Sequence, residues 1–110
     1  MTTSAIRYGH GVIFIKDSEL REFLKAITVN LSARSDVAWL IEVCNGWMDD
    51  HENLPPGLRD IELDDALADV AKRSSFRSYL SALMAAEPGE EVYDLKVACG
   101  VIEKIISKLL

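Results

Sequence analysis

The sequence predicts a mainly α fold, an irregular four- to five-helix bundle with a short N-terminal β-hairpin or extended segment. Apolar residues recur at helical spacing over most of the chain after residue 16, and stretches that contain proline or glycine interrupt this pattern. β-Prone runs come before that point. With 110 residues, about half of them apolar, the chain can bury one core, so we expect residues 1–110 to form a single compact domain.

The first elements are predicted from local chemistry. Residues 6–16 are two β-prone runs around Gly9-His10-Gly11, where glycine permits a tight turn, which favours a hairpin. Asp17 is the candidate N-cap of the first helix. The apolar stripe of that helix consists of Leu20, Phe23, Leu24, Ile27 and Leu31.

A second helix is predicted from Ser35, and Leu54-Pro55-Pro56-Gly57 ends it because proline lacks the amide donor. Its apolar stripe is Val37, Leu40, Ile41, Cys44, Trp47 and Met48. Trp39 lies off this stripe, and we expect it to be partly exposed or wedged under the hairpin.

A third helix is predicted from Asp60, with Leu63, Ala66, Leu67, Val70 and Ala71 on one face. The apolar residues after it are out of phase with that face, so we expect a break near Arg73-Ser74-Ser75 and a fourth helix beyond it. The last helix is predicted to start near Pro88. It has two apolar flanks, which suggests that it is central to the bundle or lies at a dimer seam.

Acidity is concentrated in one segment. Eight of the eighteen carboxylates lie in residues 49–69, where Arg59 is the only Lys or Arg, so the segment has a formal charge of −7 and the remainder +1. Such a field attracts a cationic partner and speeds its arrival. A net charge of −6 argues against nucleic-acid binding and against docking to an anionic membrane.

We therefore expect a partner-binding surface within this segment. Carboxylates near a helix start favour the dipole, but Asp49, Asp50 and Glu52 are predicted at a helix C-terminus, where the dipole penalises negative charge. Trp47 either packs in the core or anchors a partner, and Leu54 is a second candidate anchor. The candidate partner-binding residues are Trp47, Asp49, Asp50, Glu52, Leu54, Asp60, Glu62, Asp64 and Asp65. The alternative is a merely solvated acidic face.

Catalytic and metal-binding patterns are absent from the sequence. The acidic residues lack the spacing of a calcium loop, and neither H-x-x-x-H nor E-x-x-H occurs, so we expect no metal and no cofactor. A triad would require His10 or His51 to meet Cys44 or a serine in space, which the spacing does not support. Cys44 and Cys99 fit two buried structural thiols. We expect a protein that is not an enzyme.

These observations lead to the hypothesis of a small acidic protein that occludes one basic protein partner, in the way that a bacterial immunity protein neutralises a nuclease-type toxin. One alternative is a helical adaptor or homodimerising regulatory module that uses the C-terminal helix. A carboxylate-dependent metal protein or enzyme is a further alternative. The N-terminus has no apolar leader and no stretch of the chain reaches the length of a membrane span, so we expect a cytoplasmic location.

Overall fold

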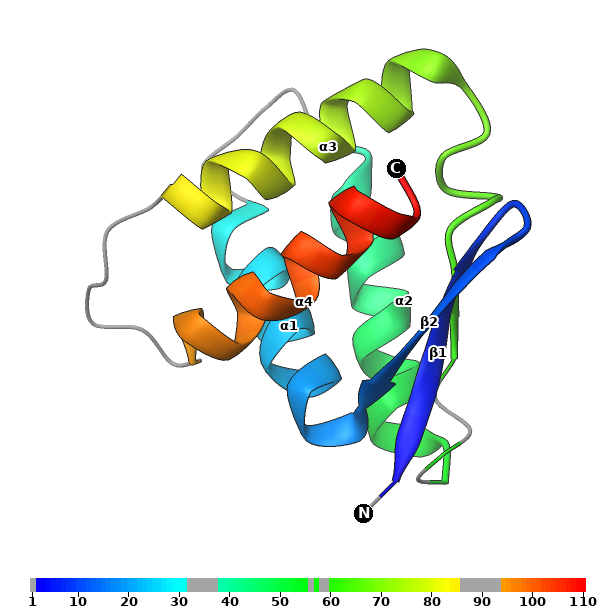
Figure 1. Ribbon diagram of the computed structural model, residues 1–110, viewed down its shortest axis with the longest axis vertical. Coiled ribbons are helices and arrows are strands. Elements are labelled where there is room, and N and C mark those ends of the chain that lie inside the picture. The colour runs from blue at the N-terminus through cyan, green and yellow to red at the C-terminus, as the bar shows by residue number, and fades with distance from the viewer. Residues whose placement is uncertain (1, 32–37, 56, 58–59, 86–93) are drawn as a thin grey trace.

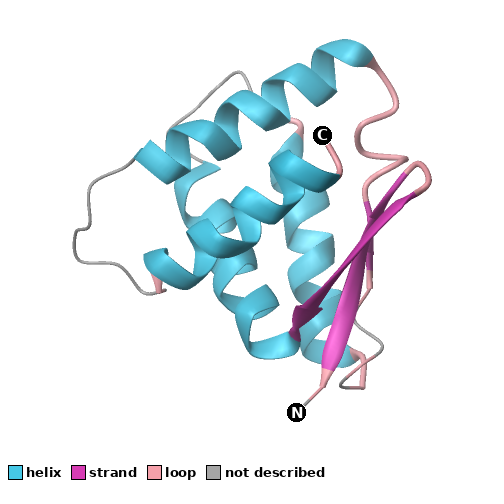
Figure 2. Cartoon of the chain, in the orientation of Figure 1, coloured by secondary structure: helices cyan, strands magenta, loops and turns pink. Residues whose placement is uncertain are grey.

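The computed structural model describes residues 2–31, 38–55, 57, 60–85 and 94–110. In this part of the chain, the structure has four helices and a small three-stranded sheet (Figure 1, Figure 2). The elements are β1 (Thr3–Tyr8), β2 (Gly11–Lys16), α1 (Asp17–Asn30), α2 (Leu40–Asn53), β3 (Ile61–Glu62), α3 (Val70–Ala85) and α4 (Leu95–Lys108). Helices α1 and α4 pack against the hairpin, and α2 and α3 pack on these helices. The mainly α class is confirmed, and the described residues form four helices and no fifth.

The N-terminal hairpin is confirmed. β1 and β2 pair antiparallel, with Tyr8 opposite Gly11 and a two-residue loop of Gly9 and His10. Gly9 has a φ of +59°, whereas no non-glycine residue in the described ranges has a positive φ. A positive φ at the first loop residue alone is typical of a type II′ turn, whose twist suits a hairpin.

The third strand is a correction to the predicted helix from Asp60. β3 joins the other side of β1 in parallel, so the strand order is β2-β1-β3. Ile61 and Leu63 are buried on either side of the exposed Glu62, which is the alternation of a strand. The Asp60 carboxylate accepts a hydrogen bond from the Ala5 N–H at 2.9 Å. This contact aligns the segment along β1.

A single helix, α3, follows, so the predicted break near Arg73-Ser74-Ser75 is wrong. Its N–H groups are capped by Asp69, whose carboxylate accepts from the Lys72 N–H at 2.7 Å. The buried residues are Phe76, Tyr79, Leu80 and Leu83. Val70 and Ala71 are exposed, because the first turn of the helix projects beyond the core. The apolar pattern of the sequence changes phase because Val70 and Ala71 face solvent, whereas the buried face of α3 begins at Phe76.

Helix α1 carries the buried stripe that was predicted, and Leu20, Phe23, Leu24, Ile27 and Leu31 are all in the core. The prediction of Asp17 as N-cap is wrong, since Lys16 occupies that position and Asp17 is the first helical residue. The Asp17 carboxylate is buried and accepts hydrogen bonds from the Thr2 and Ser4 hydroxyls and the Gly57 N–H. Asp17 therefore connects the start of α1 to the N-terminal residues Thr2 and Ser4 and to Gly57, which follows α2.

Helix α2 begins at Leu40 in the described residues, and the predicted start at Ser35 and the stripe residue Val37 lie outside them. The helix ends at Asn53, immediately before Leu54 and Pro55, as predicted. The stripe is only partly buried. Leu40 and Cys44 are in the core and Trp47 and Met48 pack against it, but Ile41 is exposed, contrary to prediction. Trp39 is half-buried and contacts the Lys72 ammonium at 5.4 Å.

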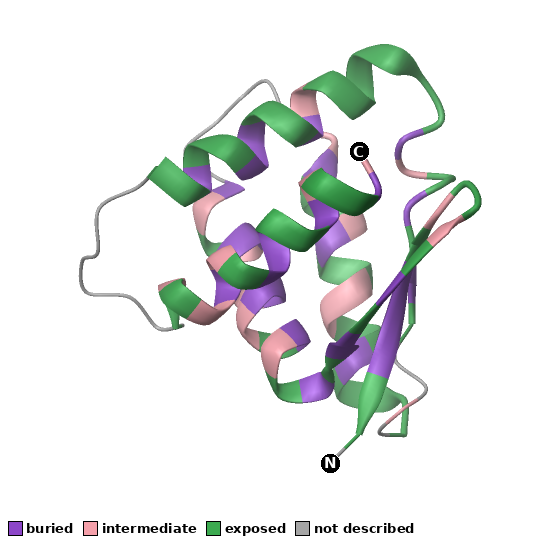
Figure 3. Ribbon diagram, viewed as in Figure 1, coloured by how far each residue is buried: buried purple, intermediate pink, exposed green. Residues whose placement is uncertain are grey.

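Helix α4 packs along α1 in the middle of the helical layer (Figure 1). Asp94 caps it by accepting from the Lys96 and Val97 N–H groups, while Pro88 lies outside the described residues. Its buried residues are Ala98, Val101, Ile102 and Ile105. The centre of the predicted apolar face is therefore buried within the monomer, whereas Leu95, Val97, Cys99 and Ile106 at its margins are half-buried, and the outer side of the helix is exposed (Figure 3). The described part of α4 presents no exposed large apolar side chain that could form a dimer seam.

Candidate functional site

The last turn of α2 carries three exposed carboxylates, Asp49, Asp50 and Glu52, which we call the α2 cluster. Carboxylates at a helix C-terminus oppose the dipole, at a cost of about 0.3–1 kcal/mol each at low salt. Within the described residues, no Lys or Arg pairs with any of the three. In the described part of the chain, no ion pair therefore offsets the negative charge of this turn.

Apolar side chains border the α2 cluster. Leu54, which follows the helix, is 38% exposed. Trp47 is half-buried and its ring meets Phe76 edge-to-face, with centroids 6.5 Å apart. Trp47 thus contributes to the core. Leu54 is the more accessible of the two predicted anchors.

The remaining predicted carboxylates, Asp60, Glu62, Asp64 and Asp65, form the β3 group, and two of them are bound to the hairpin. Asp60 accepts from the Ala5 N–H and lies 3.3 Å from Arg7 Nη1. Asp64 accepts from the Gly9 N–H at 2.9 Å. These two carboxylates therefore hold β1 and the hairpin loop against the segment that follows α2.

Glu62 and Asp65 are more exposed. The Glu62 side chain is 70% exposed and its carboxylate lies 4.0 Å from Arg7 Nη1, a pair that contributes little in water. Asp65 is exposed, and no interaction of its side chain with the described residues is present. Arg7 therefore offsets part of the negative charge of the β3 group, whereas no Lys or Arg of the described residues forms an ion pair with the α2 cluster.

The carboxylates of the β3 group are spread along the hairpin and do not converge on one point. Asp60 contacts β1 at Ala5, whereas Asp64 contacts the hairpin loop at Gly9, beyond the end of β1 at Tyr8. Among the described residues, no three His, Cys, Asp or Glu side chains converge as metal ligands would. The arrangement produces a broad negative field and offers no point-like cation site.

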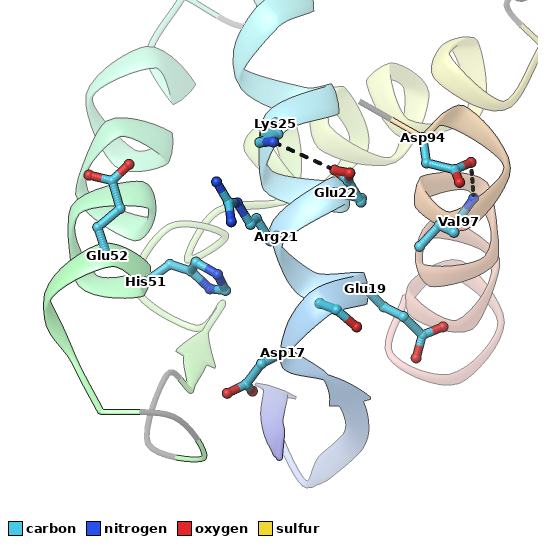
Figure 4. Close-up of a pocket in the computed structure, with 10 residues that line it drawn as sticks. Asp17, Glu19, Arg21, Glu22, Lys25, His51, Glu52, Asp94 and Val97 are labelled. Carbon is cyan, nitrogen blue, oxygen red and sulfur yellow. Dashed lines mark hydrogen bonds and ion pairs between the residues drawn. The ribbon is translucent and has the colours of Figure 1, made fainter. Parts of the chain in front are cut away.

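A depression of about 710 Å³ extends the α2 cluster across α1 to the start of α4 (Figure 4). Glu52 belongs to both the cluster and this depression. The Arg21 side chain reaches from α1 towards the end of α2, and Glu22 pairs with Lys25 at 4.0 Å on the same helix. The depression is lined by Asp17, Ser18, Glu19, Arg21, Glu22, Lys25, His51, Glu52, Asp94 and Val97. Its five carboxylates outnumber its two fixed cations.

Sequence reasoning missed this depression. Glu19 and Glu22 belong to α1, and Asp94 precedes α4, so packing of the helices is what brings them near Glu52. In sequence they look like an ordinary polar helix face and a cap. His51 was considered only as a ligand or base, and it is buried, with 5% of its surface exposed, at the wall of this depression.

The other chemically reactive residues lie apart from the α2 cluster. Burial raises the pKa of the Cys44 thiol to about 12, so this side chain stays protonated and is a poor nucleophile at neutral pH. Cys99 is half-buried, which corrects the prediction that both thiols are buried. His10 is exposed in the hairpin loop.

Comparison with known proteins adds no assignment, since no family model, no curated protein and no solved structure matches the chain. Among the described residues, every helix is too short or too polar to cross a membrane.

Proposed function

We propose that this chain is an acidic binding protein that captures and occludes a basic protein. The observation that carries the proposal is the α2 cluster, three exposed carboxylates at the helix end where the dipole disfavours them. The interaction of these carboxylates with the helix dipole lowers the stability of the fold. A binding role explains this placement, because unpaired charge of one sign steers a partner of opposite sign and speeds association.

The depression beside the cluster supplies a shape for recognition. A lysine or arginine side chain of the partner would contact Glu52 at the end of α2, whereas Glu19 lines the same depression on the α4 side of α1 (Figure 4). Partial exclusion of water strengthens such a contact relative to one on a flat surface. Leu54, 38% exposed at the rim, would add apolar contact.

For the class of partner, we propose a nuclease-type toxin, with this chain as its immunity protein. An enzyme that acts on nucleic acid presents a cationic face to the phosphates. A compact acidic protein can cover that face and prevent the substrate from binding. Fast electrostatic capture and slow release suit an inhibitor that must act before the toxin does.

The test compares two double variants that have the same net charge. D49K/D50K removes two carboxylates of the α2 cluster, and E42K/E103K removes two exposed carboxylates elsewhere, so each variant has a formal net charge of −2. The wild-type chain is immobilised at low salt, retained proteins are eluted with a salt gradient, and the retained partner is then titrated against all three chains by calorimetry.

We expect D49K/D50K to lose affinity for the partner by at least about tenfold and E42K/E103K to lose much less, because only the first variant changes the proposed contact surface. Inhibition of nuclease activity by the wild-type chain then tests the class of partner. Equal weakening by both variants would show that net charge alone matters, and retention of no basic protein would contradict the proposal.

A homodimer through α4 is less favoured, since Ala98, Val101, Ile102 and Ile105 are buried in the monomer and no described apolar residue of that helix is fully exposed. The third alternative, a metal protein or enzyme, has no converging ligand set among the described residues.

A further inference from the structure

The free edge of β2 is an interaction surface independent of the acidic residues. β2 is the outer strand of the order β2-β1-β3, so it pairs with β1 on one side and with no strand of the described chain on the other. A strand edge offers unpaired N–H and C=O groups that another strand can bind.

The contacts of β1 show which groups of β2 point outward. The Ala5 N–H and the Arg7 C=O both bond towards the β3 side, to Asp60 and to the Leu63 N–H. In an antiparallel pair, residues with hydrogen bonds across the pair alternate with residues that lack them. Phe14 is opposite Ala5 and Val12 is opposite Arg7. The main-chain groups of Val12 and Phe14 therefore point away from β1, to the free edge.

The side chains on this edge are apolar and exposed. Val12 is 44% exposed and Phe14 is 66% exposed, while Ile13 and Ile15 between and beside them are buried. Proteins commonly protect an edge strand with lysine, proline or a bulge. No charged residue or proline occurs between Gly11 and Ile15, and Lys16 is the first charge in the strand.

We propose that β2 pairs antiparallel with β2 of a second copy of this chain and so joins two three-stranded sheets into one. The local two-fold axis passes beside Ile13, which sets Val12 of each copy opposite Phe14 of the other. The outward N–H and C=O groups of these residues then form four main-chain hydrogen bonds. Aromatic and β-branched side chains are a favourable cross-strand pair.

A second copy fits this edge better than an unrelated strand for two reasons. The strand is complementary to itself, because one register satisfies the free main-chain groups and covers both exposed apolar side chains at once. Charge also permits the approach, although each chain has a net charge of −6. The β3 group lies towards the opposite edge of the sheet, and residues 11–16 contain no carboxylate.

The test uses the full chain and two matched lysine variants. F14K places a charge on the proposed interface, and V70K places the same charge on the first turn of α3, where Val70 is 78% exposed. Light scattering and sedimentation equilibrium over a concentration series give the mass, and circular dichroism confirms that both variants fold. Amide hydrogen exchange of residues 11–16 is followed at low and high protein concentration.

We expect the wild-type chain and V70K to move with concentration from 12.2 kDa to twice that mass. F14K should raise the dimer dissociation constant by about a hundredfold, because each dimer buries two Phe14 side chains. The amides of Val12 and Phe14 should become protected as the dimer forms. A wild-type chain that stays monomeric, or an F14K chain that dimerises like the wild type, would overturn the proposal. Protection of these amides only on addition of a basic partner would equally overturn it.

Discussion

Removal of the Asp60 carboxylate should destabilise the protein, although Asp60 was predicted as a partner-binding residue. In D60A the Ala5 N–H loses an acceptor at 2.9 Å, and Arg7 loses a pair at 3.3 Å. A hydrogen bond to a charged group contributes about 1.5–3 kcal/mol. The ion pair contributes about 0–1 kcal/mol, because 47% and 34% of the two side chains are exposed. The free energy of unfolding should therefore fall by about 1.5–4 kcal/mol.

Urea unfolding measures this loss, and D65A is the matched control. Asp65 is exposed and its side chain contacts none of the described residues, so D65A should stay within about 0.5 kcal/mol of the wild type. With a urea slope of about 1–3 kcal/mol per molar, the D60A midpoint should fall by about 1 M. The Ala5 amide should exchange faster in D60A alone. Equal midpoints for D60A and D65A, or unchanged Ala5 exchange, would refute a structural role for Asp60.

Three further predictions concern the core and the turns. Y79F should lower the free energy of unfolding by about 1 kcal/mol, because the Tyr79 hydroxyl donates to a buried carbonyl of α1 at 2.6 Å, whereas Y8F should have little effect; thermal unfolding measures both. Burial raises the pKa of the Cys44 thiol in the folded state to about 12 from an ordinary 9.0. This difference contributes stability that is fully present below pH 9 and is lost as the pH rises from 9 to 12. In urea unfolding at several pH values, C44A should therefore show a smaller fall in the free energy of unfolding over that range than the wild type. G46A should stabilise by about 0.5–1 kcal/mol, because it adds a methyl group in open space within α2, while G9A should destabilise through its φ of +59°; opposite signs in urea unfolding check this pair.

Sequence reasoning succeeded where neighbouring residues determine the structure. The type II′ turn depends on Gly9, and the buried stripe of α1 depends on a spacing of three and four residues that no competing pattern disturbs. The exposure of the α2 cluster follows similarly, because Pro55 fixes where the helix ends and the helical period decides which residues face solvent. These features needed no knowledge of distant contacts.

The segment from Asp60 to Asp69 could not be predicted in the same way. Ile61, Leu63 and Leu67 fit a strand at spacing two and a helix at spacing four, so the sequence is ambiguous there. The choice is made by contacts with β1, fifty-five positions away along the chain, where the Ala5 and Gly9 N–H groups find carboxylate acceptors. For the same reason the structural roles of two predicted binding residues were not visible in the sequence.

The two proposed interactions should respond to salt in opposite directions. Capture of a basic protein by the α2 cluster depends on attraction between opposite charges, so it should weaken as the ionic strength rises and the Debye length falls from about 10 Å at 0.1 M to about 3 Å at 1 M. Pairing of two β2 edges uses neutral main-chain groups and apolar side chains. It must also overcome repulsion between two chains that each have a net charge of −6, and salt screens this repulsion. Dimerisation should therefore strengthen over the same range. A dimer that dissociates with added salt would place its interface on charged residues and not on Val12 and Phe14.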